Sequence, residues 1–157
     1  MSLAIRWITR KDLDEVLAIE SASFEFPWTE SEFLDVLRSR NAIGLVAIEG
    51  GAAVGYAVYE LHKDRMCLLN LAVDQFSRRC GVGRALVETM IGKLTKYRRT
   101  HISCEVRERN LAAQLFLKVM GFQAVAILRD FYDDTNEDSY QFRFNVKQTA
   151  EAECQGV

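Results

Sequence analysis

The order of apolar and polar residues predicts one domain in which strands and helices alternate. Runs with the continuity or alternation of strands occur at residues 4–8, 43–49, 52–62, 66–73, 101–106, 122–128 and 140–146. Apolar residues with the spacing of a helix follow Thr9 and Thr29, include Leu86 and Met90, and occur again from Leu111. Hairpins precede a β-α-β-α-β order, so we expect a mixed α/β (α+β) fold, a central twisted mixed β-sheet with helices on both faces.

Capping residues mark two of the expected helix starts. Thr9 with Asp12, and Thr29 with Glu32, have the three-residue spacing of a capping box. The domain is expected to span residues 1–147, and the polar residues 148–157 are expected to form a flexible tail.

Size, charge and cysteine use exclude several classes of function. A chain of 157 residues with a net charge of -2 is one domain without a general attraction to nucleic acid or to an anionic membrane. Its apolar runs fall short of the ~18 residues of a membrane span, and its start lacks the form of a signal peptide. The scattered cysteines favour free thiols over a metal site. We therefore expect a cytoplasmic protein without a metal.

The stretch SRRCGVGRALVE, residues 77–88, predicts an anion site. It is not a Walker loop, because Val82 alone separates Gly81 from Gly83, and Leu86 stands where a dinucleotide fingerprint has its third glycine. Glycines allow close backbone approach, and free N–H groups at a helix start attract an anion such as pyrophosphate. Arginines would add charge-assisted donors: Arg78, Arg79 and Arg84. The alternative is a plain strand-to-helix turn with solvated arginines.

This stretch, which follows LNLAVD and leads into a helix, resembles the acetyl-CoA-binding motif of the GNAT N-acetyltransferases. CEVRERNLAAQLFLKVMGF is similar to the second CoA-contacting block of that superfamily. FPWTESEF, and EVRERN followed by RDFYDD, resemble the ribosomal-protein-alanine N-acetyltransferases. The resemblance extends to about Val146 and implies the GNAT fold and acetyl-CoA as cosubstrate.

The resemblance also implies which residues contact CoA. Main-chain groups of a strand that splays from its neighbour would hold the acetyl carbonyl and the pantetheine arm, and N–H groups of residues 79–84 would surround the pyrophosphate. Asn110 matches the family asparagine that contacts the cofactor; a helix N-cap is its alternative role, and both can hold together. The implied set is Leu71, Ala72, Val73, Arg78, Arg79, Cys80, Gly81, Val82, Gly83, Arg84, Asn110 and Leu117.

Acetyl transfer requires a base, because an ammonium must lose a proton before it attacks a thioester. The resemblance implies that Glu105, in EVR, is this base. A carboxylate in a central strand is costly unless it is paired, so a structural ion pair with Arg107 on the same strand face is the alternative. We expect partial burial to raise the pKa of Glu105 toward the working range.

The general acid that the resemblance implies has no counterpart at its usual position in this sequence. In the alanine acetyltransferases a tyrosine on the helix before Gly-Phe protonates the departing thiolate, and here that position is Leu117, which has no proton to donate. A general acid contributes ~10²–10⁴ in rate, although a thiolate is a tolerable leaving group. Tyr132 or water would be the substitute, and Tyr132 has substrate lining or packing as its alternative role.

The acceptor groove is expected between the aromatic loop at residues 24–28 and an acidic loop before the last strand. Exposed aromatics beside acidic residues suit a basic peptide. The substrate residues are expected to be Phe26, Trp28, Asp133 and Asp134. A solvated turn without a partner is the alternative for the acidic loop.

The sequence therefore predicts transfer of acetyl from acetyl-CoA to a primary amine, foremost the N-terminal α-amine of a ribosomal or other protein. A small amine or a lysine side chain is the alternative acceptor. A non-catalytic CoA-binding module is the alternative from another class, because Leu117 replaces the family acid.

Overall fold

The computed structural model describes residues 2–146, and the tail predicted at 148–157 lies outside these residues. Its strands are β1 (Leu3–Trp7), β2 (Ala42–Glu49), β3 (Ala52–Leu61), β4 (Arg65–Val73), β5 (His101–Arg107), β6 (Gln123–Leu128) and β7 (Ser139–Asn145). Its α-helices are α1 (Leu13–Ser23), α2 (Glu30–Arg38), α3 (Val82–Lys96) and α4 (Leu111–Val119). Each predicted strand is confirmed, with ends that differ by at most one residue, and each predicted helix is confirmed, the first after a 3₁₀ turn at Arg10–Asp12.

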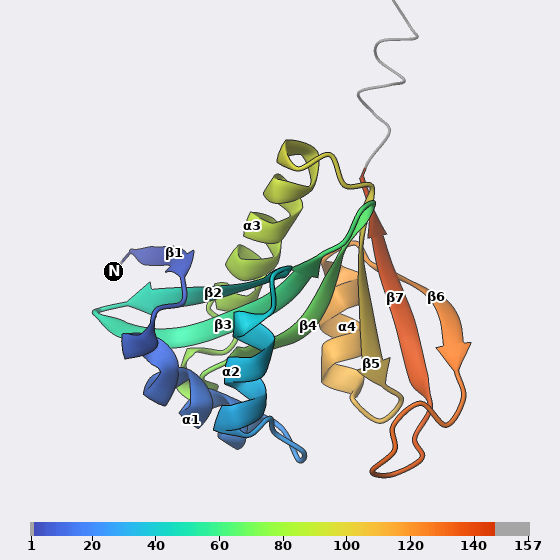
Figure 1. Cartoon of the computed structure of the whole chain (residues 1–157), viewed down its shortest axis with the longest axis horizontal. Helices are drawn as coiled ribbons and strands as arrows, with labels where there is room; N and C mark the ends of the chain where they lie inside the picture. Colours follow the sequence, from blue (N-terminus) through green and yellow to red (C-terminus); the bar gives the residue numbers. More distant parts are fainter. Residues whose placement is uncertain (1, 147–157) are drawn as a thin grey trace, which may run out of the picture.

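One sheet of order β1-β2-β3-β4-β5-β7-β6 organises the domain (Figure 1). Its neighbours pair antiparallel, except for the parallel pair β4 and β5, which α3 connects. Helices α1 and α2 lie on one face, and α3 and α4 lie on the other (Figure 1). The predicted mixed α/β fold, with a twisted mixed sheet covered on both faces, is thus confirmed.

Two apolar cores, one on each face, follow from the alternation of side chains along the strands. In β3, Ala57 and Tyr59 pack with α3 residues such as Leu86, whereas Tyr56 and Val58 pack on the opposite face. Both sides of this strand are buried, so its sequence is apolar almost throughout. The sheet is held from both faces around β3 and β4.

Both predicted caps form, the first of them as a complete capping box. Asp12 Oδ2 accepts the Thr9 N–H at 2.7 Å, in a box that opens the 3₁₀ turn Arg10–Asp12 ahead of α1. Thr29 Oγ1 accepts the Glu32 N–H at 3.1 Å and begins α2. The Thr29 cap directly follows the aromatic loop at residues 24–28, so it fixes where that loop ends and α2 begins.

A helix long and apolar enough to cross a membrane is absent from the described part of the chain.

Candidate active site

The site is built where β4 and β5 part. Their parallel ladder runs from Arg65 opposite His101 to Leu68 opposite Cys104 and ends there, although both strands continue. On its other side β4 stays paired with β3 up to Val73, after a register shift at Val58/Tyr59. Beyond Leu68, therefore, the edge of β4 that faces β5 has no partner strand. Its Val73 carbonyl is bonded by Arg78, and Leu71 on this stretch lines the pocket, where its main-chain groups can meet a ligand. The splayed strand implied by the family resemblance is present.

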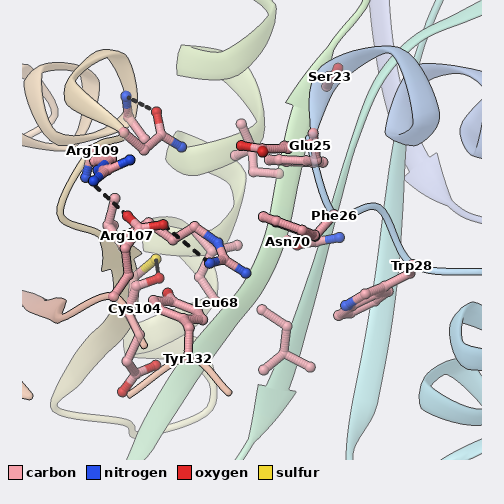
Figure 2. Close-up of a pocket in the computed structure, with 18 of the residues that line it drawn as sticks. Ser23, Glu25, Phe26, Trp28, Leu68, Asn70, Cys104, Arg107, Arg109 and Tyr132 are labelled. Carbon is pink, nitrogen blue, oxygen red and sulfur yellow. Dashed lines mark hydrogen bonds and ion pairs between the residues drawn. The ribbon is translucent and has the colours of Figure 1, made fainter. Parts of the chain in front are cut away.

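A pocket of about 530 Å³ opens at this split. Residues of β4 form its centre, and the α1–α2 loop with Phe26 and Trp28 faces β5 and the β6–β7 loop with Tyr132 across it (Figure 2). The pocket is also bordered by the start of α4, through Asn110. The structure thus brings the predicted base, aromatic loop, asparagine and tyrosine together.

Glu105 is the first residue of β5 beyond the β4 ladder. It lines the pocket, is half-buried, and accepts a hydrogen bond from Gln141 Nε2 at 3.2 Å. The alternative ion pair with Arg107 does not form: Arg107 pairs with Asp134 and Glu137. The cost of a carboxylate inside a central strand is avoided because the neighbouring strand departs at this position.

The loop before α3 has the geometry of an anion cradle. Gly81 is the N-cap with φ of +84°, a conformation that favours glycine. The Ala85 N–H bonds the Gly81 carbonyl at 3.0 Å, so the three preceding N–H groups of α3 lie before the first intrahelical bond. A Cβ on Gly83 would lie 3.2 Å from the Phe116 ring, which lines the pocket. Residues 78–84 do not line the pocket themselves, but Gly83 lies beside Phe116 at its border, and the unbonded N–H groups of this helix start can attract an anion.

The three arginines of the loop are placed differently from one another. The Arg78 Nε–H donates to the Val73 carbonyl at 3.0 Å, and its Nη2 donates to Ser23 Oγ at 3.2 Å. Arg84 Nη1 lies 3.7 Å from Oε1 of Glu88, which is one helical turn further along α3. Arg79 is exposed with φ of +62°. Arg78 thus ties the loop to the end of β4 and to α1, a role that the sequence did not predict.

Asn110 fulfils its predicted capping role and also lines the pocket. Its Oδ1 accepts the Ala113 N–H at 3.2 Å. The two roles predicted for this residue are therefore compatible in one conformation.

Arg107 connects the two loops at the entrance. Its guanidinium donates two hydrogen bonds to Asp134, at 2.7 and 3.0 Å. Its Cζ lies 3.9 Å from the centre of the Tyr132 ring and 4.9 Å from that of Phe26, which belongs to the opposite loop. The neighbouring guanidinium lowers the pKa of Asp134, which stays ionised. Arg107 is thus a bridge across the entrance.

The carboxylates of the predicted acidic loop differ in their surroundings. Asp134 is engaged by Arg107, and neither Asp133 nor Asp134 lines the pocket. Glu25 and Glu137 are the loop carboxylates that do line it. The charge of Asp134 is therefore balanced within the protein.

Both positions considered for the general acid border the pocket. Leu117 is buried, with 3% exposure, and lines the pocket from α4 as its place in the family motif implies. Tyr132 also lines the pocket, and burial, the main cause, raises the pKa of its phenol, which keeps the proton on the oxygen. Of the two, only Tyr132 carries a proton that it could donate.

Sequence reasoning missed Glu20 and Asn70. Both line the pocket, and Asn70 Nδ2 donates to Glu20 Oε1 at 2.6 Å. One signal was present in the sequence, because Glu20 lies one helical turn after Val16 on the face of α1 that carries the apolar residues. Within residues 2–146, no cluster of histidine, cysteine or acidic side chains suits a metal ion.

Known proteins are similar to this chain in sequence and in fold. Residues 13–122 match the acetyltransferase (GNAT) family. The chain is 32% identical over 125 residues to ribosomal protein bS18-alanine N-acetyltransferase of Escherichia coli strain K12, a match covering 80% of this chain and 84% of that protein. It is 30% identical over 137 residues to a putative enzyme of the same name from Bacillus subtilis strain 168, covering 87% and 91%.

Solved structures agree with these sequence matches. The E. coli ribosomal-protein-S18-alanine N-acetyltransferase has a TM-score of 0.83 at 28% identity, covering 93% of this chain and 95% of that one. Ard1 from Thermoplasma volcanium has a TM-score of 0.85 at 28% identity, covering 94% and 99%. The chain belongs to the acetyltransferase (GNAT) family and is an acetyl-CoA-dependent N-acetyltransferase.

Proposed function

We propose that this enzyme acetylates the N-terminal α-amine of a protein, foremost a ribosomal protein, in the cytoplasm, with Glu105 as general base. The observation that carries the proposal is the position of Glu105 at the parting of β4 and β5, between an unpaired strand edge and two loops that border an open pocket. Relatives named for acetylation of an alanine of ribosomal protein bS18 support the choice of acceptor.

The residues of the chain suggest how the reaction proceeds. Main-chain groups of β4 beyond Leu68, at Leu71, Ala72 and Val73, would orient the thioester, and the loop from Arg79 to Arg84 would hold the pyrophosphate. Glu105 would take a proton from the ammonium of the acceptor, and the neutral amine would then attack the thioester carbon. The C–S bond would break as the amide forms, CoA would leave as the thiolate, and its sulfur would gain a proton from Tyr132 or water while the new amide nitrogen loses its second proton to solvent. Gln141 holds the Glu105 carboxylate in place. Proton removal by a positioned base contributes ~10²–10⁴ in rate.

The acceptor is tested directly by a peptide screen. Incubation with acetyl-CoA and a library of N-terminal peptides, followed by mass spectrometry, is expected to show acetyl on the α-amine of peptides that begin with a small residue. Acetylation confined to lysine side chains or small amines would replace this proposal with the alternative acceptor. Family membership favours an enzyme over the non-catalytic module suggested by Leu117.

Leu117→Tyr is expected to speed release of the thiol if the wild type lacks a general acid. The Leu117 side chain borders the 530 Å³ pocket, so a phenol has room to extend into it. Turnover by stopped-flow thiol detection should rise, by at most the ~10²–10⁴ that a general acid contributes. Tyr132→Phe is the companion variant: if it is slow and Leu117→Tyr gives no gain, Tyr132 is the acid already in use.

Arg107→Lys is expected to raise the KM for peptides by about tenfold, because lysine keeps the charge but loses the paired hydrogen bonds and the stacking on two rings. Affinity for acetyl-CoA, measured by calorimetry, should stay the same. Arg129→Lys is the matched control, since Arg129 pairs with Asp138 at 2.7 Å in the same loop and lies outside the pocket. An equal effect of both variants would show that Arg107 only stabilises the loop.

A further inference from the structure

Glu20 is a buried carboxylate that the proposed mechanism does not use. It lies on α1 with 1% exposure, yet it borders the active-site pocket. Burial, the largest influence, raises its pKa, while hydrogen bonds from three residues act in the opposite direction. A side chain such as methionine would fill a similar volume without the cost of burying a carboxylate. The carboxylate of Glu20 is therefore costly for stability alone, and its hydrogen-bond partners indicate its role.

Donors from three different parts of the chain converge on this carboxylate. Oε1 accepts from the Tyr56 hydroxyl of β3 and from Asn70 Nδ2 of β4 at 2.6 Å. Oε2 accepts the main-chain N–H of Trp28 at 2.8 Å. One side chain thus connects α1, β3, β4 and the aromatic loop. Of the residues that donate to it, Asn70 of β4 and Trp28 of the loop line the pocket (Figure 2).

Aromatic contacts close this connection into a ring. The Trp28 and Phe33 rings meet edge to face with centroids 5.4 Å apart, and Phe33 meets Tyr56 in the same way at 5.7 Å. Tyr56 then returns to Glu20 through its hydroxyl. Within this ring, the bond from Oε2 to Trp28 is the polar link that fixes the loop backbone.

Both ends of the link are at functional positions. Asn70 immediately precedes Leu71, where β4 has already left β5 and its main chain would orient the thioester. Trp28 belongs to the loop that faces the acceptor side of the pocket. The separation of these two segments fixes the space through which the first residue of a peptide must pass.

We propose that Glu20 is a positioning residue that holds the aromatic loop at a set distance from β4 and thereby determines how well a peptide binds. The inference rests on the proposed function, because it concerns the acceptor side of the same site. Glu20 is not a second base: both of its oxygens already accept hydrogen bonds within the protein, whereas Glu105 has a single such bond, from Gln141.

Glu20→Gln breaks the link selectively. Glutamine has one oxygen, which can keep the Tyr56 and Asn70 donors, and its NH₂ group then faces the Trp28 N–H, donor against donor. The KM for a peptide that the wild type acetylates is expected to rise about tenfold, the change expected from one lost charge-assisted hydrogen bond. Affinity for acetyl-CoA should be unchanged, and hydrogen exchange at the Trp28 amide should become faster.

Glu15→Gln is the matched control. Glu15 lies on the same helix, and its Oε2 accepts the Ala53 N–H at 3.0 Å outside the pocket. Its peptide KM and the Trp28 exchange rate should equal those of the wild type. Glu20→Met, which removes the charge without adding a donor, should reproduce the KM increase if Glu20→Gln folds poorly.

The outcomes separate this inference from the proposed function. A wild type that acetylates no peptide would reject the proposed acceptor. A wild type that is active on peptides, with an unchanged KM in a folded Glu20 variant, would reject the positioning role alone. Fast exchange of the Trp28 amide in the wild type would also reject that role, whatever the variants do, because the hydrogen bond on which it depends would be absent.

Discussion

A Glu105→Gln enzyme is expected to turn over about 10²- to 10⁴-fold more slowly than the wild type near neutral pH, because glutamine cannot take a proton from the acceptor ammonium. The substitution is nearly isosteric. In the wild type Gln141 Nε2 donates to Glu105 Oε1 at 3.2 Å, and the glutamine oxygen of the variant can accept the same hydrogen bond. Affinity for acetyl-CoA and the melting temperature should therefore stay close to the wild-type values. Steady-state kinetics with a peptide acceptor measures the loss.

The pH dependence distinguishes a base from a structural carboxylate. An α-amine has a pKa of about 7.7–8.0, so the fraction already neutral grows as the pH rises through that range. The ratio of wild-type to variant rate should accordingly shrink above about pH 8. Glu108→Gln, near Glu105 in sequence but outside the pocket, should follow the wild-type profile throughout. A constant ratio from acid to alkaline pH would remove Glu105 from the chemistry.

Local patterns sufficed to predict the elements, because their determinants are close together in the sequence. Thr9 and Thr29 each have their capping partner three residues away, and both caps form. The glycine pair at residues 50–51 turns with positive φ at both positions, as a tight hairpin requires. Strand order was not accessible in this way: β7 lies between β5 and β6, although β6 precedes it in the chain.

Candidate site residues that lie together in one motif can be recognised from the sequence. Residues that only folding brings together cannot be recognised in this way. The loop before α3 is contiguous, so its glycines and arginines suffice to predict an anion site there. The alternative role of Glu105, an ion pair with Arg107, rests on their closeness in sequence, but the structure places Asp134 against Arg107 from a loop 27 residues away. Such a partner depends on strand pairing, which the sequence does not display.

Gly83→Asp is expected to weaken acetyl-CoA binding about 100-fold or more, which corresponds to the loss of two charge-assisted hydrogen bonds at roughly tenfold each. Its carboxylate would stand in the first turn of α3, beside the N–H groups that would bond the pyrophosphate. Its Cβ would also meet the Phe116 ring at 3.2 Å. An acidic residue in a first helical turn stabilises the helix through its dipole, so loss of binding would not stem from loss of α3.

Two control variants isolate the charge. Gly92→Asp places the same residue in the same helix, where an added Cβ has no neighbour within 4 Å, and isothermal calorimetry should find wild-type affinity. Gly83→Ala introduces the contact with Phe116 without the charge, so it should lose less affinity than Gly83→Asp. Repulsion between carboxylate and phosphates weakens with screening, and the deficit of Gly83→Asp should therefore narrow as salt rises. Wild-type affinity of Gly83→Asp at low salt would place the pyrophosphate away from this helix start.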